Sequence, residues 1–213
     1  FIAERGLDIK NPISGVYLPA QERKRTRHPI SFENINKLRI ACEEKNDELR
    51  WLVALLIDSG MRLSEALGLK KSDLCLNDEL PYVSIREHEH RRLKTANSVR
   101  KVPLIGISLW AANQINQRDG EYCFPRYVNA DSCNRNSASA ALNKWVKTVC
   151  QSNDVIHGLR HAFRDRLRAV QTPSEVIDQL GGWSHKSIGE SYGDGYPLDV
   201  LMIWMKEIES NGR

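Results

Sequence analysis

The sequence has no apolar run near the roughly 18 residues that a membrane-spanning helix needs, and it has no internal repeat or low-complexity tract. Its five cysteines include no CxxC pair, so neither a thiolate zinc site nor a disulfide framework is indicated. These absences disfavour membrane, disordered and disulfide-stapled proteins, and we expect a cytoplasmic location. With 41% hydrophobic and 27% charged residues over 213 positions, the composition is that of an ordinary globular protein.

The first part of the chain differs from the rest. It has neither the basic nor the apolar region of a signal peptide, and Asn11-Pro12 is expected to end a helix. The segment that follows, up to Pro29, is basic and shows no periodicity. We therefore expect a fragment of a longer protein, in which residues 1–29 are the end of a preceding domain plus a basic linker and residues 30–213 form the main domain.

The main domain is predicted to have a predominantly helical α+β fold. Strand-like alternation at 82–86, 91–95 and 100–104, with polar turns between, predicts a three-stranded antiparallel meander with Lys94 at the end of its second strand. Helical patterns are expected at 32–45, 47–57, a short segment carrying Arg62 and Glu65, 107–117, 138–150, 157–170, 172–180, 185–192 and 197–208. Helices should therefore pack around a small sheet.

Positive charge is concentrated in three blocks. The whole chain carries +4, whereas residues 20–29 carry +3, residues 86–101 carry +4 and residues 157–168 carry +3. The rest of the chain is therefore acidic. If the blocks share one face they would suit a polyanion such as nucleic acid, although charged runs are often only solvated surface.

Two local patterns could take part in chemistry. In HGLR, His157 and Arg160 lie three residues apart on a helix and can reach one point, where they would suit a phosphate. Tyr192, in GESYGDGY, could be presented to a large substrate, but a phenol needs cationic neighbours to act as a nucleophile. Each pattern alone is weak, and a basic surface helix and a packing tyrosine are the simpler interpretations.

The order of such residues along the chain is more specific. Arg62 in SGMRLSEALGL, Lys94 in RLKTANSVRKVPL, the HGLR pair, Trp183 in LGGWSHKS and Tyr192 nine residues later closely resemble the tyrosine recombinase (phage integrase) family. The resemblance covers about residues 12–205, nearly the whole chain. It implies the helical fold of that family's catalytic domain for residues 30–213, with the end of a DNA-binding domain before it.

The resemblance also implies roles for single residues. Arg62 and Arg160 match the two arginines that hold the scissile phosphate, Lys94 the hairpin lysine and Tyr192 the nucleophile. His157 and Trp183 match two further catalytic positions, and Glu65 matches an acidic residue that supports the site. We expect the surrounding basic residues to contact DNA: Arg91, Arg92, Arg100, Lys101, Arg23, Lys24 and Arg25.

The chemistry is consistent with these residue types. Two arginines can neutralise the non-bridging oxygens of a phosphodiester without a metal, so no cofactor is expected. Tyr192 would form a 3′-phosphotyrosyl bond and expel a 5′-hydroxyl. Lys94 is the candidate proton donor, with His157 helping to move the proton of the tyrosine. Trp183 has only an indole N–H to donate, so it can bond to a phosphate oxygen or support the site.

Several assignments stay open. His185 is an alternative to Trp183, Tyr196 is a rival nucleophile, and Lys101 and Arg100 lie close to Lys94 in sequence. On a strand, His88 and His90 would point to the same side and could bind a metal; a solvated turn is the simpler reading, and no metal site is predicted.

The leading hypothesis is a site-specific DNA recombinase or integrase of a phage or mobile element. The alternatives are a non-catalytic DNA-binding module, an enzyme with type IB-like topoisomerase activity, and a metal-dependent nuclease. The predicted partners are double-stranded DNA, further copies of the chain in a tetramer on DNA, and DNA-bending accessory proteins; no membrane is expected. The C-terminal amphipathic segment could pack on its own domain or on a neighbour.

Overall fold

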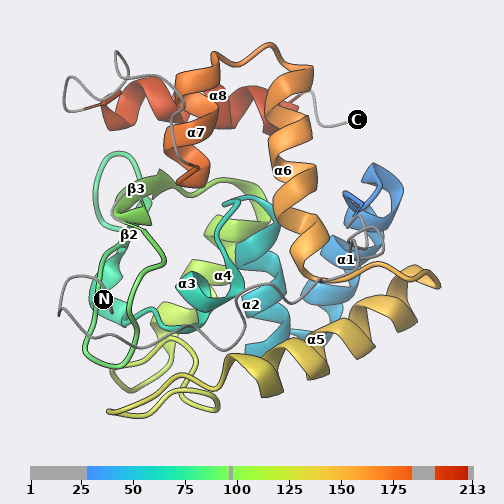
Figure 1. The fold of residues 1–213 in the computed structure, drawn as a ribbon, viewed down its shortest axis with the longest axis vertical. Helices are drawn as coiled ribbons and strands as arrows, with labels where there is room; N and C mark the ends of the chain where they lie inside the picture. The colour runs from blue at the N-terminus through green and yellow to red at the C-terminus, as the bar shows by residue number, and fades with distance from the viewer. Residues whose placement is uncertain (1–27, 96–97, 184–194, 211–213) are drawn as a thin grey trace, which may run out of the picture.

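The computed structural model of the chain describes residues 28–95, 98–183 and 195–210. It confirms a predominantly helical fold with a small three-stranded antiparallel sheet (Figure 1). The elements run in the order α1 (Phe32–Lys45), α2 (Glu48–Ile57), α3 (Leu63–Leu67), η1 (Lys71–Asp73), β1 (Leu74–Cys75), β2 (Tyr82–Ile85), β3 (Arg100–Pro103), α4 (Gly106–Gln117), α5 (Arg135–Cys150), α6 (His157–Ala169), α7 (Ser174–Gly181) and α8 (Leu198–Ser210).

Helix α2 is the centre of the hydrophobic core. Every residue from Leu52 to Ile57 is buried, so the helix is covered on all sides, and its main neighbours are α1 and α4. Asp47 caps its N-terminus by accepting a hydrogen bond from the backbone N–H of Arg50. Gly60 then takes a left-handed conformation at φ +61°, and a Cβ there would lie within 2.3 Å of the Phe163 ring. Only glycine fits this turn, which leads the chain into α3.

The sheet differs in one strand from the predicted meander. Its order is β1-β2-β3, with both pairs antiparallel, so β2 and β3 match two of the three predicted strands. The predicted strand over 91–95 is wrong: this segment makes only an isolated bridge between His88 and Arg91. The side chains of His90 and Arg91 turn inward instead, and both hydrogen-bond to the carbonyl oxygen of Gly68. The third strand is β1, whose two residues are too short to show a pattern in the sequence.

Most helices begin and end where the sequence predicts. Helix α5 is longer than expected: it begins at Arg135, three residues before the predicted start, and the side chain of Asn134 caps it by accepting from the backbone N–H of Ser137. Figure 1 shows α5 running across the bottom of the molecule, with α7 and α8 at the top above the sheet. The helix predicted at 185–192 lies outside the described residues, as do residues 1–27, which include the predicted end of a preceding domain and most of the predicted linker.

The C-terminal helix packs on its own domain. Leu201, Met202, Met205 and Ile208 of α8 are buried, and the helix contacts β3 and α6. Of the two placements that the sequence leaves open, the structure therefore has the intramolecular one. None of the helices among the described residues is long and apolar enough to cross a membrane.

Candidate active site

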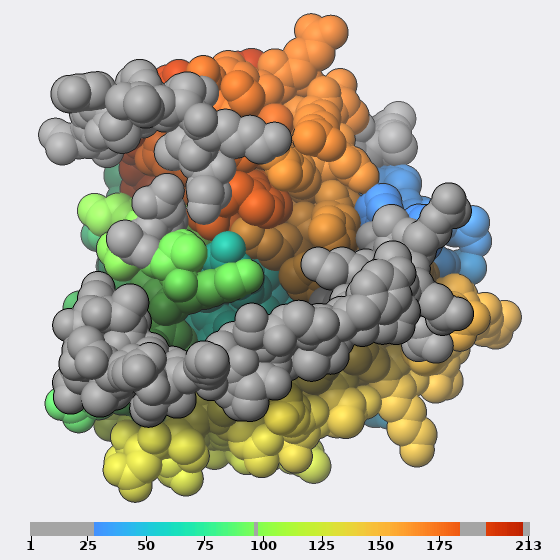
Figure 2. Space-filling model, in the orientation of Figure 1, coloured from blue at the N-terminus to red at the C-terminus, as the bar shows by residue number. Residues whose placement is uncertain are grey.

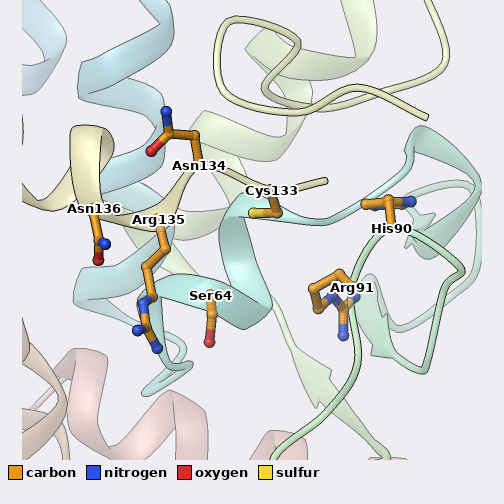
Figure 3. A pocket seen from close by; sticks show the side chains of 7 residues that line it. All are labelled: Ser64, His90, Arg91, Cys133, Asn134, Arg135 and Asn136. Carbon is orange, nitrogen blue, oxygen red and sulfur yellow. The ribbon is translucent and has the colours of Figure 1, made fainter. Parts of the chain in front are cut away.

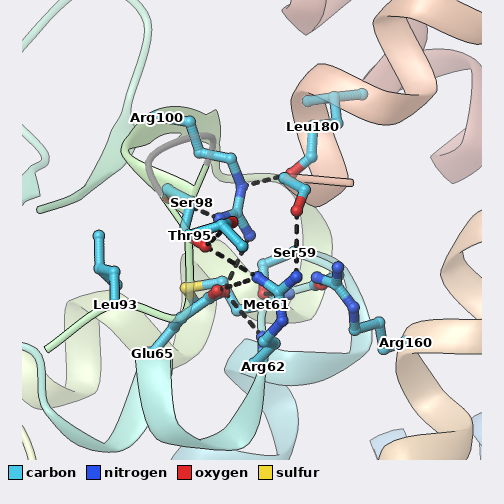
Figure 4. Close-up of polar contacts among 12 residues, drawn as sticks. Ser59, Met61, Arg62, Glu65, Leu93, Thr95, Ser98, Arg100, Arg160 and Leu180 are labelled. Carbon is cyan, nitrogen blue, oxygen red and sulfur yellow. Dashed lines mark hydrogen bonds and ion pairs between the residues drawn. The ribbon is translucent and has the colours of Figure 1, made fainter. Parts of the chain in front are cut away.

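Arg62 stands at the start of α3, where several elements meet. Its Nη1 donates to the Glu65 carboxylate and, at 3.2 Å, to the hydroxyl of Ser98. Its Nη2 donates to the carbonyl oxygen of Gly182 at 3.1 Å, which lies at the end of α7. The guanidinium is therefore held by groups from α3, from the segment before β3 and from α7, and Figure 4 shows these contacts as dashed lines.

Glu65 is the buried anion of the site. Its side chain is 2% exposed, and its Oε2 accepts hydrogen bonds from the backbone N–H of Arg62 at 2.9 Å and from Arg100 Nη2 at 3.0 Å. Burial by itself would raise the pKa of this carboxyl, but the charge of Arg100 and the hydrogen bonds outweigh it, so the pKa lies below its ordinary value. Glu65 is therefore ionised at neutral pH and pairs with Arg62.

Arg100 corrects one sequence-based expectation. Its side chain is only 3% exposed, and all three guanidinium nitrogens donate within the protein: Nε to the carbonyl of Leu180, Nη1 to that of Ser98 and Nη2 to Glu65. A guanidinium used in this way does not contact DNA at the surface. Arg100 instead ties β3 to α3 and to the end of α7.

Arg160 projects from the first turn of α6 beside Arg62. Its Nη1 donates to the carbonyl oxygen of Gly60, and its Cζ lies 4.3 Å from the centre of the Trp183 ring. Figure 4 shows the guanidinium groups of Arg62 and Arg160 next to each other, although the residues are about a hundred positions apart in sequence. The structure thus brings the two candidate phosphate-binding arginines together.

The charge of Arg160 is poorly compensated. The residue is 5% exposed, and its buried Nη2 has no hydrogen-bond partner among the described residues. Burial, followed by repulsion from Arg62, lowers the pKa of Arg160 to about 9. The guanidinium is still protonated at neutral pH, so the site holds a buried cation that would be stabilised by an external anion.

The end of α7 supplies the ring that lies against Arg160. Gly182 takes a left-handed conformation at φ +62°, and a Cβ there would lie 2.6 Å from Arg100 Nη1. This turn directs the Gly182 carbonyl to Arg62 and brings the Trp183 ring close to a second cation, Arg164, whose Cζ lies 4.8 Å from the ring centre. Trp183 therefore supports the arginines through cation–π contacts, with its ring facing them.

His157 and Lys94 lie at the edges of this arrangement. His157 is the first residue of α6, is half-buried, and its ring meets that of His161 edge to face at 4.9 Å between centroids. Lys94 is exposed between β2 and β3. Its neighbour Thr95 shares a hydrogen bond of 3.1 Å with Ser98, which in turn bonds to Arg62. Lys94 therefore directly precedes Thr95, from which hydrogen bonds lead through Ser98 to Arg62.

The remaining predicted residues divide into exposed, buried and undescribed ones. Arg92 and Lys101 are exposed, and Lys101 Nζ lies 4.9 Å from the centre of the Tyr82 ring. Arg91 is buried, and its Nη2 donates to the Gly68 carbonyl at 3.4 Å. Tyr192, His185 and the group Arg23, Lys24 and Arg25 lie outside the described residues.

Tyr196, the rival nucleophile, is described. Its backbone N–H donates to the side chain of Gln179 at 2.7 Å, and its carbonyl accepts from the same side chain at 2.8 Å. The segment after the candidate nucleophile is therefore tied by its backbone to α7.

The two histidines of the EHEH segment are engaged within the protein. His88 Nε2 lies 2.7 Å from Asp73, His90 Nε2 lies 3.0 Å from the Gly68 carbonyl, and the rings stack at 5.3 Å. Over residues 28–95, 98–183 and 195–210, no three His, Cys, Asp or Glu side chains are grouped so that they could hold a metal ion.

Sequence reasoning missed several contributors to the site. Ser98, in the segment treated as a polar turn, bonds to Arg62, and the backbone carbonyls of Gly60, Leu180 and Gly182 each accept from a site arginine. A carbonyl oxygen is common to every residue, so the sequence holds no signal for it. The glycines in SGMR and LGGW are the only hint, because they mark turns.

In the space-filling view, the surface around this site is hollowed. The teal surface near α3 lies deep between the green segment before β3 and the orange surface of α6 and α7 (Figure 2). A half-buried arginine, Arg62, and a buried one, Arg160, together with a carboxylate and an indole ring, form at this hollow a site for an anion, most simply a phosphate group.

Known structures share this fold. The integrase from mycobacterium phage Brujita is 17% identical, with a TM-score of 0.64 over 97% of this chain and 66% of that one. The Tn1549 transposon integrase, solved in complex with transposon right end DNA, is also 17% identical, with a TM-score of 0.59 over 96% of this chain and 74% of that one. The chain therefore shares the fold of these two integrases.

The sequence itself decides the family. Residues 29–196 match the phage integrase family, and the chain belongs to that family of tyrosine recombinases and integrases. The tyrosine recombinase XerC of Actinobacillus pleuropneumoniae serotype 7 (strain AP76) is 26% identical over 192 residues, which cover 85% of this chain. The chain spans 59% of the length of that relative.

Proposed function

We propose that the chain is the catalytic domain of a site-specific DNA recombinase that cuts and rejoins DNA through a phosphotyrosyl intermediate. Residues 30–213 would form this domain, and residues 1–29 would be the end of a preceding DNA-binding domain with its linker. Family membership supports the class of reaction, and the Tn1549 relative, solved with transposon DNA, supports DNA as the substrate.

One observation carries the proposal more than any other. Arg62 and Arg160 converge from α3 and α6, and the buried Nη2 of Arg160 has no partner among the described residues. A phosphodiester would supply the missing anion, with its two non-bridging oxygens shared by two guanidinium groups. Cleavage adds negative charge to these oxygens, so prearranged cations would stabilise the transition state.

The reaction would run through Tyr192. Its phenol oxygen would attack the phosphorus and form a P–O bond to the 3′ side of the DNA, while the bond from phosphorus to the 5′ oxygen breaks. The phenol proton would pass to His157, and Lys94 would donate a proton to the leaving oxygen. The exposed position of Lys94 between β2 and β3 is compatible with this role, because its side chain is free to reach a bound duplex.

Rejoining would reverse these steps on a new strand end. A 5′-hydroxyl would attack the phosphotyrosyl phosphorus, and the tyrosine would leave with its proton restored. The bond energy is retained in the covalent intermediate, so no nucleotide cofactor is needed, and with the arginines balancing the charge the mechanism requires no metal. Exchange between two sites requires several protomers. We expect a monomer without DNA, a tetramer on DNA, and DNA-bending accessory proteins.

A nicked suicide substrate tests the proposal. On such a duplex the short strand diffuses away after cleavage and the covalent protein–DNA adduct accumulates. We expect the wild-type protein to form this adduct in the presence of EDTA, and the adduct to map to the peptide that contains Tyr192. Tyr192→Phe should bind the duplex as well as the wild type and form no adduct.

Tyr196→Phe is the matched control and should keep adduct formation. An adduct that survives in Tyr192→Phe and disappears in Tyr196→Phe would move the nucleophile to Tyr196. Duplex binding without any adduct would reduce the chain to a DNA-binding module. Relaxation of supercoiled DNA without exchange between two sites would indicate a topoisomerase, and cleavage abolished by EDTA would indicate a metal-dependent nuclease.

A further inference from the structure

A second cationic pocket lies beside the candidate active site. It has a volume of about 320 Å³ and is lined by Ser64, His90, Arg91, Cys133, Asn134, Arg135 and Asn136 (Figure 3). Three separate parts of the chain contribute to it: α3, the segment after β2 and the N-terminal end of α5. The lining includes two arginines and no aspartate or glutamate. The pocket is therefore rich in hydrogen-bond donors and positive charge.

The unpaired nitrogens of Arg91 are the main evidence that this pocket binds a ligand. It is only 4% exposed, yet its buried Nε and Nη1 have no hydrogen-bond partner in the part of the chain that the structure describes. Its Nη2 has only a long contact of 3.4 Å to the Gly68 carbonyl. Burial lowers the pKa of Arg91, although the charges of Asp73 and Glu65 oppose this. Both carboxylates are already paired, Asp73 with Arg86 and Glu65 with Arg62 and Arg100.

The other polar side chains of the pocket lie near Arg91. Figure 3 shows Ser64 between Arg91 on one side and Arg135 on the other. Arg135 is exposed and is the first residue of the 16-residue helix α5, whose N-terminus adds a partial positive charge. His90 also lines the pocket, but its Nε2 is already engaged by the Gly68 carbonyl at 3.0 Å. A tetrahedral anion would be reached by two guanidinium groups and by the serine hydroxyl.

We infer that this pocket binds a phosphate of the DNA backbone next to the scissile one. The inference rests on the proposed function for its choice of ligand. Ser64 follows Arg62 by two residues on α3, so the pocket and the active site share one short helix. Each nucleotide of a DNA strand carries one phosphate charge, so a strand whose scissile phosphate lies at Arg62 and Arg160 offers further phosphates close by to the pocket. The pocket would then fix the register of the duplex relative to Arg62 and Arg160.

The test removes the exposed arginine of the pocket. Arg135→Gln deletes one charge without disturbing the core, and Arg168→Gln is its matched control, because Arg168 is exposed on α6 outside the pocket. Duplex binding is measured against salt concentration. For Arg135→Gln we expect affinity to fall about tenfold, as for one lost charge-assisted hydrogen bond, and the log–log salt slope to fall by about 0.9. Arg168→Gln should keep the wild-type slope.

A second measurement locates the phosphate. Neutral methylphosphonate linkages are placed one at a time through the duplex, and the loss of affinity is recorded at each. The wild-type protein should show a penalty at one linkage beside the scissile position, and this penalty should be smaller in Arg135→Gln, which keeps only Arg91 and Ser64 as partners of that phosphate. An unchanged penalty at every linkage, or a salt slope equal to that of Arg168→Gln, overturns the inference.

Inorganic phosphate carries the same charged oxygens as a DNA phosphate and is the alternative ligand for this pocket. If inorganic phosphate raises the melting temperature of the wild type but not of Arg135→Gln, while the linkage penalties stay unchanged, the pocket binds a small anion and the DNA assignment is wrong. The proposed function fails separately: its failure is a wild-type protein that shows the linkage coupling and yet forms no covalent adduct on the suicide substrate.

Discussion

The two arginines of the candidate active site are held in very different ways. Arg62 donates to a carboxylate, a hydroxyl and a carbonyl, and its anionic partner Glu65 is shared with Arg100. Arg160 has one carbonyl and the face of an indole ring, and one of its buried nitrogens is unpaired among the described residues. The Arg62 side of the site is therefore complete within the protein, whereas the Arg160 side is left short of an anion.

This difference suggests that the Arg62 side matters mainly for the stability of the fold and the Arg160 side mainly for catalysis. Glu65 is buried and pairs with two arginines, so removing its charge would leave Arg100 as an uncompensated buried cation. The unpaired Nη2 of Arg160 is expected to cost stability in the free protein, and a bound phosphate would offset this cost. We therefore expect changes on the Arg62 side to affect folding, and changes on the Arg160 side to affect catalysis.

Glu65→Gln should have the largest effect on stability. It keeps the shape of the side chain but leaves the buried Arg100 without its counter-charge, so we expect a loss of about 3–5 kcal/mol in the free energy of unfolding. Chemical denaturation measures this. Glu79→Gln, on an exposed residue before β2, is the control and should change stability by no more than about 0.5 kcal/mol.

The same variant should alter the pH dependence of stability. The folded-state pKa of Glu65 lies below the ordinary value of 4.5, so its contribution is fully present above that pH and is lost as pH falls through the lower folded value. Stability of the wild type should therefore decrease more steeply than that of Glu65→Gln below about pH 4.5. Parallel curves for the two proteins would contradict the assignment of Glu65 as the buried anion.

Arg160→Gln should lower the rate of strand cleavage strongly and change stability little. We expect strand cleavage to fall by about 10²–10³-fold, because a cation aimed at the transition state is lost. The melting temperature should change little, since an uncompensated buried charge is removed together with its hydrogen bond. Adduct formation on the suicide substrate and thermal unfolding are measured together, with Arg168→Gln as the control. A large loss of stability with little loss of cleavage would contradict the expected difference between Arg160 and Arg62.

Trp183→Phe should give the smallest effect. The ring that faces Arg160 and Arg164 is retained, but phenylalanine is a weaker partner for a cation than tryptophan, by about 0.5–1 kcal/mol. We expect cleavage to fall by only about two- to fivefold, as this energy difference implies. Trp51→Phe, on α2, is the control. A loss as large as that of Arg160→Gln would mean that the indole N–H itself contacts the substrate.

The comparison also shows how far sequence reasoning reaches. Periodicity predicted most helices, because each depends on which of its own residues are apolar. The strand predicted over 91–95 failed because a tertiary contact, the Gly68 carbonyl, draws His90 and Arg91 inward and overrides a local alternation. The burial of Arg91 and Arg100 was not predicted either, because the position of a charged residue along the chain carries no information on its burial.

The sequence by itself determined the chemical inventory of this protein: the order of its arginines, lysine, histidine, tryptophan and tyrosine, and with it the family. Only the tertiary structure decided which charges are matched. Arg62 meets Gly182, and Arg160 meets Gly60, across separations of 120 and 100 residues. Pairing and burial depend on such distant contacts, so the unpaired nitrogens of Arg160 and Arg91 become visible only when the chain is folded.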